Sequence, residues 1–428
     1  MPVRVANSIT LAIDGPPKGQ KLTARDHSKL ERKRKMKISR LIATAAALSL
    51  LGTAGTTMAG ETTGLTDTTI KVGVMGPFTG NASSYSKAQI GLMAYFKHIN
   101  DQGGIHGRKF EIVSEDTACA PAKGIAAAKK LVHQDKVFYL HGNSCSGVAM
   151  AVKPTVSPTG IPWIIAHAVN PKISMPVNEK RSIFHGVPAG PAYGSTMGKF
   201  VMSKPGTKRV AVVTHTNDWA KAYCDPAIKV IKDSGGEIIQ TLALERGQTD
   251  STPQVLKLKQ AKPDFILGCL YEAETVIFLR DSKKYGVKIP VMGTAGTDLE
   301  NTLERLGDIS AVRNYFVLHS FVDKVDGPKM KKWNDIILKY NPKETITGFS
   351  AVSMASGVAA VTALRAVGHD LTRSKFIAEL DKIRNLKTGI LACDITWTST
   401  DRHGCKKSAV AGFVNDKPTV LSAWGKTW

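Results

Sequence analysis

From residue 70 onward, short runs of apolar residues alternate with longer segments of mixed polarity. Several of these runs are apolar at every position, as is typical of parallel strands buried on both faces of a sheet. A strand followed by a helix, repeated along a chain, predicts a doubly wound α/β fold. The runs that predict strands are residues 70–75, 110–114, 137–140, 163–166, 209–214, 237–242, 265–270 and 290–292.

The helical pattern is clearest in residues 85–101. Leu92, Phe96 and Ile99 repeat at helical spacing and define one apolar face. The glycine pair at residues 103–104 is a stop signal, since glycine readily adopts the backbone conformation that ends a helix. This segment is therefore predicted to be an amphipathic helix packed on a sheet.

The strand and helix alternation occurs twice, over residues 67–188 and 189–316. A segment rich in Gly, Pro and Ala, residues 186–194, separates the two halves. This organisation predicts two similar lobes, each built on a doubly wound parallel sheet. Ligands of such sheets bind beyond the carboxyl ends of the strands, where helix N-termini offer unpaired N–H groups. The expected site is the cleft between the lobes.

The N-terminal 59 residues have the features of a secretory leader. A basic segment, residues 33–40, precedes an apolar run at residues 41–51, and small residues flank a cleavage site near Ala59. Met36 makes a better start than Met1, so residues 36–59 are predicted to be the signal peptide and residues 1–35 a start-site artefact. A basic nucleic-acid arm is the alternative, but it does not account for the apolar run. The run is too short to span a bilayer, which needs about 20 residues, so we expect a periplasmic protein that is not inserted in a membrane.

The charge balance is strongly basic, with 58 Lys and Arg against 35 Asp and Glu. Removal of residues 1–59 takes away 11 basic and 3 acidic side chains and leaves 47 against 32. The remaining basic residues are spread among acidic ones, without a dense stripe interleaved with aromatic residues. No nucleic-acid partner is expected, and the excess charge favours anions in general.

Six cysteines follow the leader, and an even number in an oxidising compartment favours disulfides. Fifteen pairings are open to six cysteines. The sequence has no C-x-x-C motif and no H-E-x-x-H motif, so neither zinc nor thioredoxin-type chemistry is indicated. No cofactor or metal is expected.

Three motifs together carry a family resemblance: VGVMGPFTG at residues 72–80, INDQGGIHGR at residues 99–108, and Glu115-Asp116 ahead of Cys119. They closely resemble the leucine/isoleucine/valine-binding proteins of bacterial ABC transporters, and the resemblance extends over nearly all of the chain after the leader. It implies a type I periplasmic-binding fold whose chain crosses a hinge three times. Lobe one would then hold residues 67–188 and 317–390, and lobe two residues 189–316 and 391–428.

The resemblance also implies a disulfide between Cys119 and Cys145, which stand where the family joins two loops of the first lobe. Cys393 and Cys405 flank residues 397–401, a stretch that predicts a hairpin and a second, local bridge. Cys224 and Cys269 remain and would form the third pair.

In the family, one lobe clamps the ligand carboxylate with a hydroxyl group and with N–H groups at a helix start. Ser146, directly after Cys145, matches that position. An anion at a helix N-terminus gains charge-assisted hydrogen bonds of roughly 1.5–3 kcal/mol each. Ser146 could instead serve only as the helix N-cap. A second anchoring strip matches His167, Ala168 and Val169, where His167 either donates to the anion or is a packed loop histidine.

Four aromatic residues match family positions that cover the apolar part of the ligand, and the residue expected to pair a ligand ammonium is missing. The family's amino-acid binders place a Glu where this chain has Ala295, and an unpaired buried ammonium costs several kcal/mol. Glu272, Glu274 and Asp298 remain alternative partners for it. The hypothesis is a small carboxylate without an α-ammonium; an aromatic acid held between two of the rings is favoured, and a branched-chain amino acid is the second candidate. The four rings are Tyr85, Trp219, Tyr271 and Phe349, and the pair expected to hold the ligand is Trp219 and Tyr271.

Two other classes of function compete with capture for an ABC transporter permease. Residues 141–147 resemble a nucleophile elbow, but Ser146 stands where the motif needs its closing Gly, and Cys145 is expected in a disulfide. No catalytic residue is therefore assigned, and the protein is expected not to be an enzyme. A soluble sensor that hands its closed form to a membrane receptor stays open. We expect a monomer that closes around its ligand by hinge motion.

Overall fold

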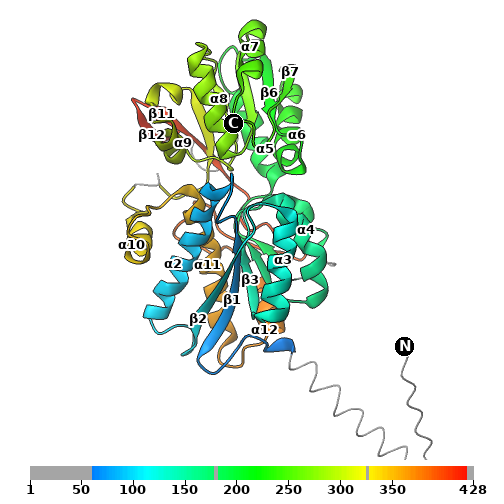
Figure 1. Ribbon diagram of the computed structural model, residues 1–428, viewed down its shortest axis with the longest axis vertical. Coiled ribbons are helices and arrows are strands. Elements are labelled where there is room, and N and C mark those ends of the chain that lie inside the picture. The colour runs from blue at the N-terminus through cyan, green and yellow to red at the C-terminus, as the bar shows by residue number, and fades with distance from the viewer. Residues whose placement is uncertain (1–59, 178–181, 324–326, 422–428) are drawn as a thin grey trace, which may run out of the picture. The chain divides into compact units, whose positions relative to one another are not determined.

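The computed structural model describes residues 60–177, 182–323 and 327–421, which form two helix-covered sheets (Figure 1). The first sheet has the strand order β2-β1-β3-β4-β5, and its neighbouring strands are all parallel. The second has the order β12-β11-β10-β9-β8-β6-β7 and is parallel except for β11 and β12 at one edge. We call the units built on them lobe one and lobe two. The strands are β1 (Thr69–Gly76), β2 (Lys109–Asp116), β3 (Tyr139–Gly142), β4 (Trp163–Ile165), β5 (Ile183–His185), β6 (Arg209–Thr214), β7 (Glu237–Ala243), β8 (Phe265–Cys269), β9 (Val291–Met292), β10 (Tyr315–His319), β11 (Ala409–Val414) and β12 (Lys417–Val420).

Helices cover both faces of the lobe-one sheet. In Figure 1, α2 and α11 lie on one face, and α3 and α4 lie side by side on the other. The predicted amphipathic helix is α2, and Gly103 and Gly104 follow it with φ angles of 95° and 77°. The helices of this lobe are α2 (Ser86–Asp101), α3 (Pro121–Lys129), α4 (Ser146–Val156), α10 (Lys331–Tyr340), α11 (Gly348–Val367) and α12 (Arg373–Lys382), with short helical turns at Ser83–Tyr85, Lys130–Gln134, Ser157–Thr159 and Pro171–Ile173.

Among the described residues, α11 is the one helix with the length and apolar composition of a membrane span. Its surroundings are those of a core helix, because 72% of its most apolar 18-residue stretch is buried in the fold. It packs so closely on α2 that a Cβ atom at Gly91 would lie 2.6 Å from the Cβ of Ser350. The apolar surface of α11 is therefore buried in the core of lobe one.

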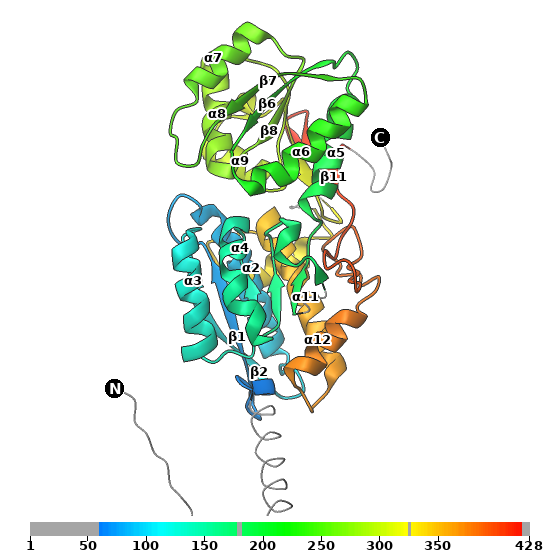
Figure 2. The ribbon, with the colours of Figure 1, turned by 90° about the vertical axis from the view of Figure 1, so that its right-hand side faces the viewer.

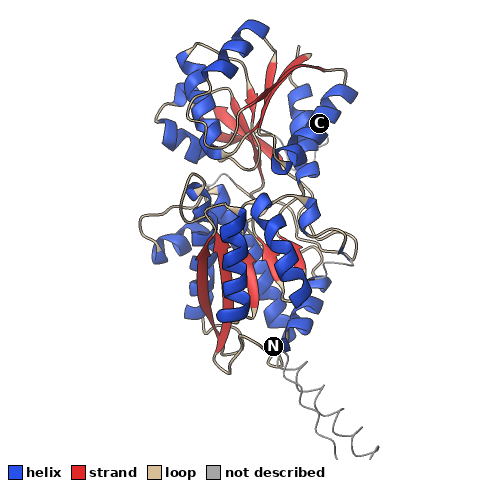
Figure 3. Cartoon of the chain, turned by 45° about the vertical axis from the view of Figure 1, so that its right-hand side comes forward, coloured by secondary structure: helices blue, strands red, loops and turns tan. Residues whose placement is uncertain are grey.

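Lobe two repeats the same layering, which Figure 2 and Figure 3 show from two other directions. Helices α5 and α6 are in close contact, since a Cβ atom at Gly194 would lie 2.2 Å from the carbonyl oxygen of Tyr223. Strand β8 is buried at every position, as its unbroken apolar sequence predicts. The helices are α5 (Gly190–Met202), α6 (Asp218–Asp233), α7 (Thr252–Ala261), α8 (Glu272–Lys284) and α9 (Leu299–Leu306), with a helical turn at Ile309–Ala311.

The chain crosses between the lobes three times, as expected. The first crossing follows β5 and leads into α5, and the second follows β10 and leads to α10. The third returns the chain to β11. Isolated β-bridges join these segments, one between His185 and His403 and another between Phe321 and Leu391.

Three details of the hinge region differ from the expected boundaries. The change of lobe expected between residues 316 and 317 falls inside β10, which belongs to the lobe-two sheet. The segment before β11 packs on the lobe-one strand β5, with the Trp397 ring 5.0 Å from that of Phe184. The expected hairpin at residues 397–401 is a tight turn without strands, in which the Thr398 N–H donates to the Asp401 carbonyl at 2.8 Å.

The structure contains the three disulfides that the sequence led us to expect: Cys119–Cys145, Cys224–Cys269 and Cys393–Cys405. The first joins the loop after β2 to the residue before α4. The second ties α6 to the end of β8, and the third closes the turn before β11. The expected leader, residues 1–59 with cleavage near Ala59, lies outside the described residues.

Candidate functional site

The N-terminus of α4 presents three unpaired backbone donors. The preceding residue, Cys145, is extended and its carbonyl accepts the first helical hydrogen bond, from Ala149 N–H at 3.0 Å. The N–H groups of Ser146, Gly147 and Val148 therefore have no partner within the helix. No side chain caps this end, and its first turn has no acidic residue. Such a helix start attracts an anion.

The hydroxyl group of Ser146 is oriented by the neighbouring loop. Its Oγ accepts hydrogen bonds from the N–H groups of Val169 at 3.2 Å and Asn170 at 3.4 Å. The residue is 1% exposed, and no described group accepts the hydroxyl proton. The alternative that Ser146 is the N-cap of α4 is wrong, because Cys145 holds that position and the Ser146 side chain bonds elsewhere. The hydroxyl proton is thus available to a ligand.

These donors open into a cavity of about 520 Å³, which we call the α4 cavity. Its volume lies within the range of small-molecule pockets, roughly 300–1,000 Å³. The N-terminus of α6 lines it from the side of lobe two. The lining includes Cys145, Ser146, Gly147, Val148 and Asn170 from lobe one, and Asn217, Asp218, Trp219, Arg246 and Tyr271 from lobe two.

Two of the predicted ring residues line the α4 cavity, but they do not leave a slot for a ligand. The rings of Trp219 and Tyr271 stack directly on each other, with centroids 4.0 Å apart and an angle of 25° between the planes. A ligand ring between them would need about twice this separation, because the thickness of each aromatic ring sets the stacking distance. The expectation of a ligand held between these two rings is therefore wrong for this conformation.

Tyr85 fastens lobe one to lobe two. Its hydroxyl group donates to the carbonyl of Gly296 at 2.7 Å and accepts from the N–H of Glu272, the first residue of α8, at 3.2 Å. Its ring lies 4.9 Å from that of Phe349 and 6.0 Å from that of Tyr271. Burial raises the pKa of the hydroxyl well above its ordinary value, so this group stays protonated and able to donate.

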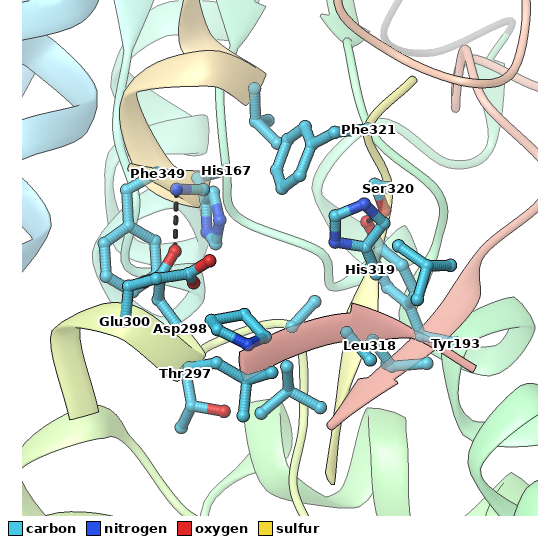
Figure 4. A pocket seen from close by; sticks show the side chains of 18 of the residues that line it. His167, Tyr193, Thr297, Asp298, Glu300, Leu318, His319, Ser320, Phe321 and Phe349 are labelled. Atoms are coloured by element: carbon cyan, nitrogen blue, oxygen red, sulfur yellow. Dashed lines mark hydrogen bonds between the residues drawn. The ribbon is translucent and has the colours of Figure 1, made fainter. Parts of the chain in front are cut away.

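Other predicted residues line a second and much smaller cavity beside the hinge strands (Figure 4). We call it the hinge cavity; its volume is about 40 Å³, enough for only a few water molecules at roughly 10–15 Å³ each. Tyr85 contacts both His167 of this cavity and Tyr271 of the α4 cavity. The lining includes His167, Tyr193, Ala295, Thr297, Asp298, Glu300, His319, Ser320, Phe321 and Phe349.

The predicted anchoring strip forms its hydrogen bonds with protein groups. The N–H of His167 donates to the Asn143 carbonyl at 3.4 Å, and that of Val169 to Ser146. The carbonyl of Ala168 lies 3.0 Å from Nδ1 of His185. Burial lowers the pKa of His167 to about 4, so its ring is neutral near pH 7 and packs 5.3 Å from that of Phe349. The strip therefore positions Ser146 through backbone hydrogen bonds.

The three acidic residues considered as ammonium partners are engaged with the protein. Glu272 is fully buried and accepts from the N–H of Asp298 at 3.0 Å and from the Thr302 hydroxyl at 2.7 Å. Burial raises its pKa to about 7. Glu274 accepts from the N–H of Gly247 at 2.9 Å. None of the three lines the α4 cavity.

Asp298 makes a second direct contact between the lobes. One carboxylate oxygen caps α9 by accepting from the Asn301 N–H at 3.0 Å, and the other accepts from the N–H of Gly348, the first residue of α11, at 2.7 Å (Figure 4). Burial raises the pKa of this carboxyl group above its ordinary value. One carboxylate thus serves two helix starts from different lobes.

Sequence reasoning missed Arg246, Asn170 and Asn217 in the lining of the α4 cavity. Arg246 lies in the loop between β7 and α7, a segment with no periodic pattern. Asn217 carries a recognisable signal, because Asn before a helical segment is a preferred N-cap, and its side chain does accept from the Ala220 N–H at 3.0 Å. Nothing local in the sequence marks Arg246.

The described part of the chain has neither a free thiol nor a cluster of potential metal ligands. All its cysteines are in disulfides, so Cys145 has no free thiol to act as a nucleophile. Those residues also contain no cluster of three or more His, Cys, Asp or Glu side chains that could hold a metal ion.

Comparison with known proteins agrees with this architecture. A family model described as periplasmic binding protein matches residues 69–417. The leucine-, isoleucine-, valine-, threonine- and alanine-binding protein of Pseudomonas aeruginosa is 28% identical over 275 residues, which are 64% of this chain and 70% of that protein. The Leu/Ile/Val-binding protein of Escherichia coli is 26% identical over 270 residues, 61% of this chain and 73% of that protein.

Solved structures share the fold at lower identity. A leucine-binding protein from Thermotoga maritima has a TM-score of 0.72 and 20% identity, covering 83% of this chain and 98% of its own. An ABC-transporter solute-binding protein from R. palustris, in complex with benzoate, has a TM-score of 0.73 and 19% identity, covering 83% and 96%.

The chain belongs to the periplasmic binding protein family. It is accordingly a binding protein rather than an enzyme.

Proposed function

We propose that this protein captures a small carboxylate between its lobes and delivers it to the permease of an ABC importer. An aromatic acid is the favoured ligand, and a branched-chain amino acid is the second candidate. The observation that carries the proposal is the uncapped start of α4, where three N–H groups and the Ser146 hydroxyl line a cavity of about 520 Å³. Charge-assisted hydrogen bonds to a carboxylate there would contribute roughly 1.5–3 kcal/mol each.

The body of the ligand would pack on the stacked pair of Trp219 and Tyr271. Both side chains line the α4 cavity, and a ligand ring on the cavity side of the pair would extend the stack. Such ring contacts contribute about 0.5–1.5 kcal/mol beyond the burial of apolar area. An aliphatic side chain would gain only from the burial, which is why an aromatic acid is preferred.

The acidic residues of the cleft are already engaged, which favours a ligand without an ammonium group. Glu272, Glu274 and Asp298 already accept hydrogen bonds from the protein, and Ala295 offers no charge. An ammonium group buried without a partner would cost several kcal/mol. Both chemistries occur among proteins of this fold, since one neighbour was solved with benzoate and another with 3,4-dihydroxybenzoic acid, whereas a third was solved with isoleucine.

Capture would proceed by hinge closure. The carboxylate would settle first on α4 of lobe one, and lobe two would then bring its ring pair over the ligand. The other predicted ligand residues belong to this proposal too, although none of them lines the α4 cavity. A ligand would reach them only after the Tyr85 ring turns away. They are Tyr85, His167, Ala168, Val169, Ala295 and Phe349. We further propose export by the leader with cleavage near Ala59, and action as a periplasmic monomer.

Titration calorimetry with the purified protein tests the ligand class. Sodium benzoate is expected to bind and to raise the melting temperature, whereas L-leucine and L-valine should do so weakly or not at all. Stabilisation by leucine or valine without any by benzoate would reject the aromatic-acid assignment. Absence of binding by all carboxylates tested would reject capture of this class altogether.

A further inference from the structure

Arg246 is the one basic side chain that lines the α4 cavity among the described residues. It extends from lobe two across the cleft, and its Nη1 donates to the carbonyl of Cys119 in lobe one at 3.3 Å. This hydrogen bond is long, since most N–H···O bonds measure 2.7–3.2 Å. The guanidinium carbon lies 5.6 Å from the centroid of the Tyr271 ring. Arg246 therefore stands beside the ring pair and beside the disulfide that precedes α4.

The charges around Arg246 leave it available to a ligand. Asp218, the other charged residue in the lining of the α4 cavity, is the first residue of α6, at the positive end of that helix. Glu274 lines a small adjoining cavity with Arg246, but it accepts from Gly247 and forms no ion pair with Arg246. No described carboxylate makes an ion pair with the guanidinium, so its only described hydrogen-bond acceptor is the Cys119 carbonyl.

We propose that Arg246 is the counter-charge that lobe two brings to the bound anion and the residue that makes the site select against an α-ammonium group. This inference rests on the proposed function and adds to it the cationic half of the clamp. When the ligand is bound in the closed cleft, the guanidinium exchanges its long bond to Cys119 for the ligand carboxylate, which Ser146 and Gly147 hold from the other side. A carboxylate gains a planar, charge-matched donor. An α-ammonium next to the same carboxylate is repelled by both Arg246 and the start of α4.

The test compares two ligands that differ only in the ammonium group, 3-phenylpropanoate and L-phenylalanine. Calorimetry with the full-length protein should show preferential binding of 3-phenylpropanoate. Arg246→Ala should weaken its binding about 10- to 100-fold, as expected for loss of a charge-assisted contact, and should narrow the preference over L-phenylalanine. Arg246→Lys should keep part of the affinity, because it keeps the charge but loses the planar fork.

Arg209→Ala is the matched control. Arg209 is also an exposed lobe-two arginine with one side-chain hydrogen bond to a backbone carbonyl, that of Ala261 at 3.0 Å, but it begins β6 at the end of the sheet away from the cavity. The affinity of the Arg209→Ala variant for 3-phenylpropanoate, and the salt dependence of that affinity, should match those of the unmodified protein. Raising the salt concentration should weaken binding to the unmodified protein more than to Arg246→Ala.

Equal affinity of Arg246→Ala and the unmodified protein for 3-phenylpropanoate, or an unchanged preference between the two ligands, would overturn the inference and leave the proposed function intact. Failure of the unmodified protein to bind 3-phenylpropanoate, benzoate and L-phenylalanine alike would overturn both.

Discussion

The start of α4 in lobe one differs in one respect from the starts of α6, α8 and α9 in lobe two. The α4 start has neither a capping side chain nor an acidic residue in its first turn. Each of these three helices carries an acid there: Asp218 for α6, Glu272 and Glu274 for α8, and Glu300 for α9. An acidic side chain in the first turn already offsets the positive charge of a helix start, whereas a helix start without one attracts an anion from solution. The comparison teaches that lobe one holds the ligand's charge and lobe two closes with side chains.

The largest expected effect comes from giving α4 the acid that it lacks. A Cβ atom at Gly147 would meet nothing within 4 Å, so Gly147→Asp can be accommodated. The new carboxylate should occupy the anion site and lower the affinity for benzoate at least about 100-fold, or about 2.7 kcal/mol. The same charge should stabilise the helix by about 0.3–1 kcal/mol. Calorimetry and thermal melting would measure these opposite effects.

Gly147→Asn is the control for this change, because it has the same shape without the charge. It should keep most of the affinity. Undiminished benzoate binding by Gly147→Asp would show that the anion lies elsewhere, and the contrast between the lobes would lose its functional meaning.

A second effect concerns the most deeply buried acid of lobe two. Glu272 has its pKa raised from 4.5 to about 7 by burial, so the folded protein holds more protons than the unfolded chain between these values. The free energy of unfolding should therefore fall as pH rises from about 5 to 8. Glu272→Gln should remove this fall and add roughly 3 kcal/mol at pH 8, since the two pKa values differ by about 2.5 and one pKa unit corresponds to 1.36 kcal/mol. Its amide can donate to Thr302, whose hydroxyl also reaches the Asp298 carbonyl at 2.6 Å.

Denaturant unfolding at several pH values would measure this slope. Glu304→Gln serves as the reference, because its side chain lies on α9 and is 76% exposed. A fall of stability with pH in Glu272→Gln as steep as in the unmodified protein would contradict the assignment of the slope to Glu272.

The smallest effect tests the contact that holds the two regions together. Tyr85→Phe removes the hydroxyl that bonds Gly296 and Glu272 across the lobes. Loss of these bonds should shift the equilibrium toward the open form by about 1–1.5 kcal/mol. Small-angle scattering without ligand should report a larger radius of gyration. Tyr340→Phe, which loses a lobe-one hydroxyl bonded to Asp101, should leave the radius unchanged; equal radii for both variants would remove Tyr85 from the closing contacts.

The sequence predicted those parts of the fold that local pattern determines. The run at residues 209–214 coincides with β6 because every step of a buried parallel strand favours apolar and β-branched residues. Strands β5 and β10 were missed, since three to five residues in a hinge give too short a pattern to distinguish from a loop. The family resemblance supplied what periodicity could not, including the position of Ser146.

The sequence predicted some of the residues of each lobe that face the candidate site, but not how those residues contact one another. That Trp219 and Tyr271 both reach the cleft follows from their places at helix starts, but their 4.0 Å stacking depends on how α6 and α8 pack. Arg246 depends on contact between a lobe-two loop and Cys119, which are 127 positions apart in the chain. No local signal encodes that distance.

The disulfide between Cys119 and Cys145 links ligand capture to export from the cytosol. It joins Cys119, whose carbonyl accepts from Arg246, to Cys145, the residue directly before α4. For a chain exported as we propose, the cytosol would keep these thiols reduced. Newly made protein would then lack the cross-link that fixes the α4 start until it has left the cytosol. Oxidation after translocation would thus act as a final maturation step, which delays tight binding until the protein reaches the compartment where its ligand is collected.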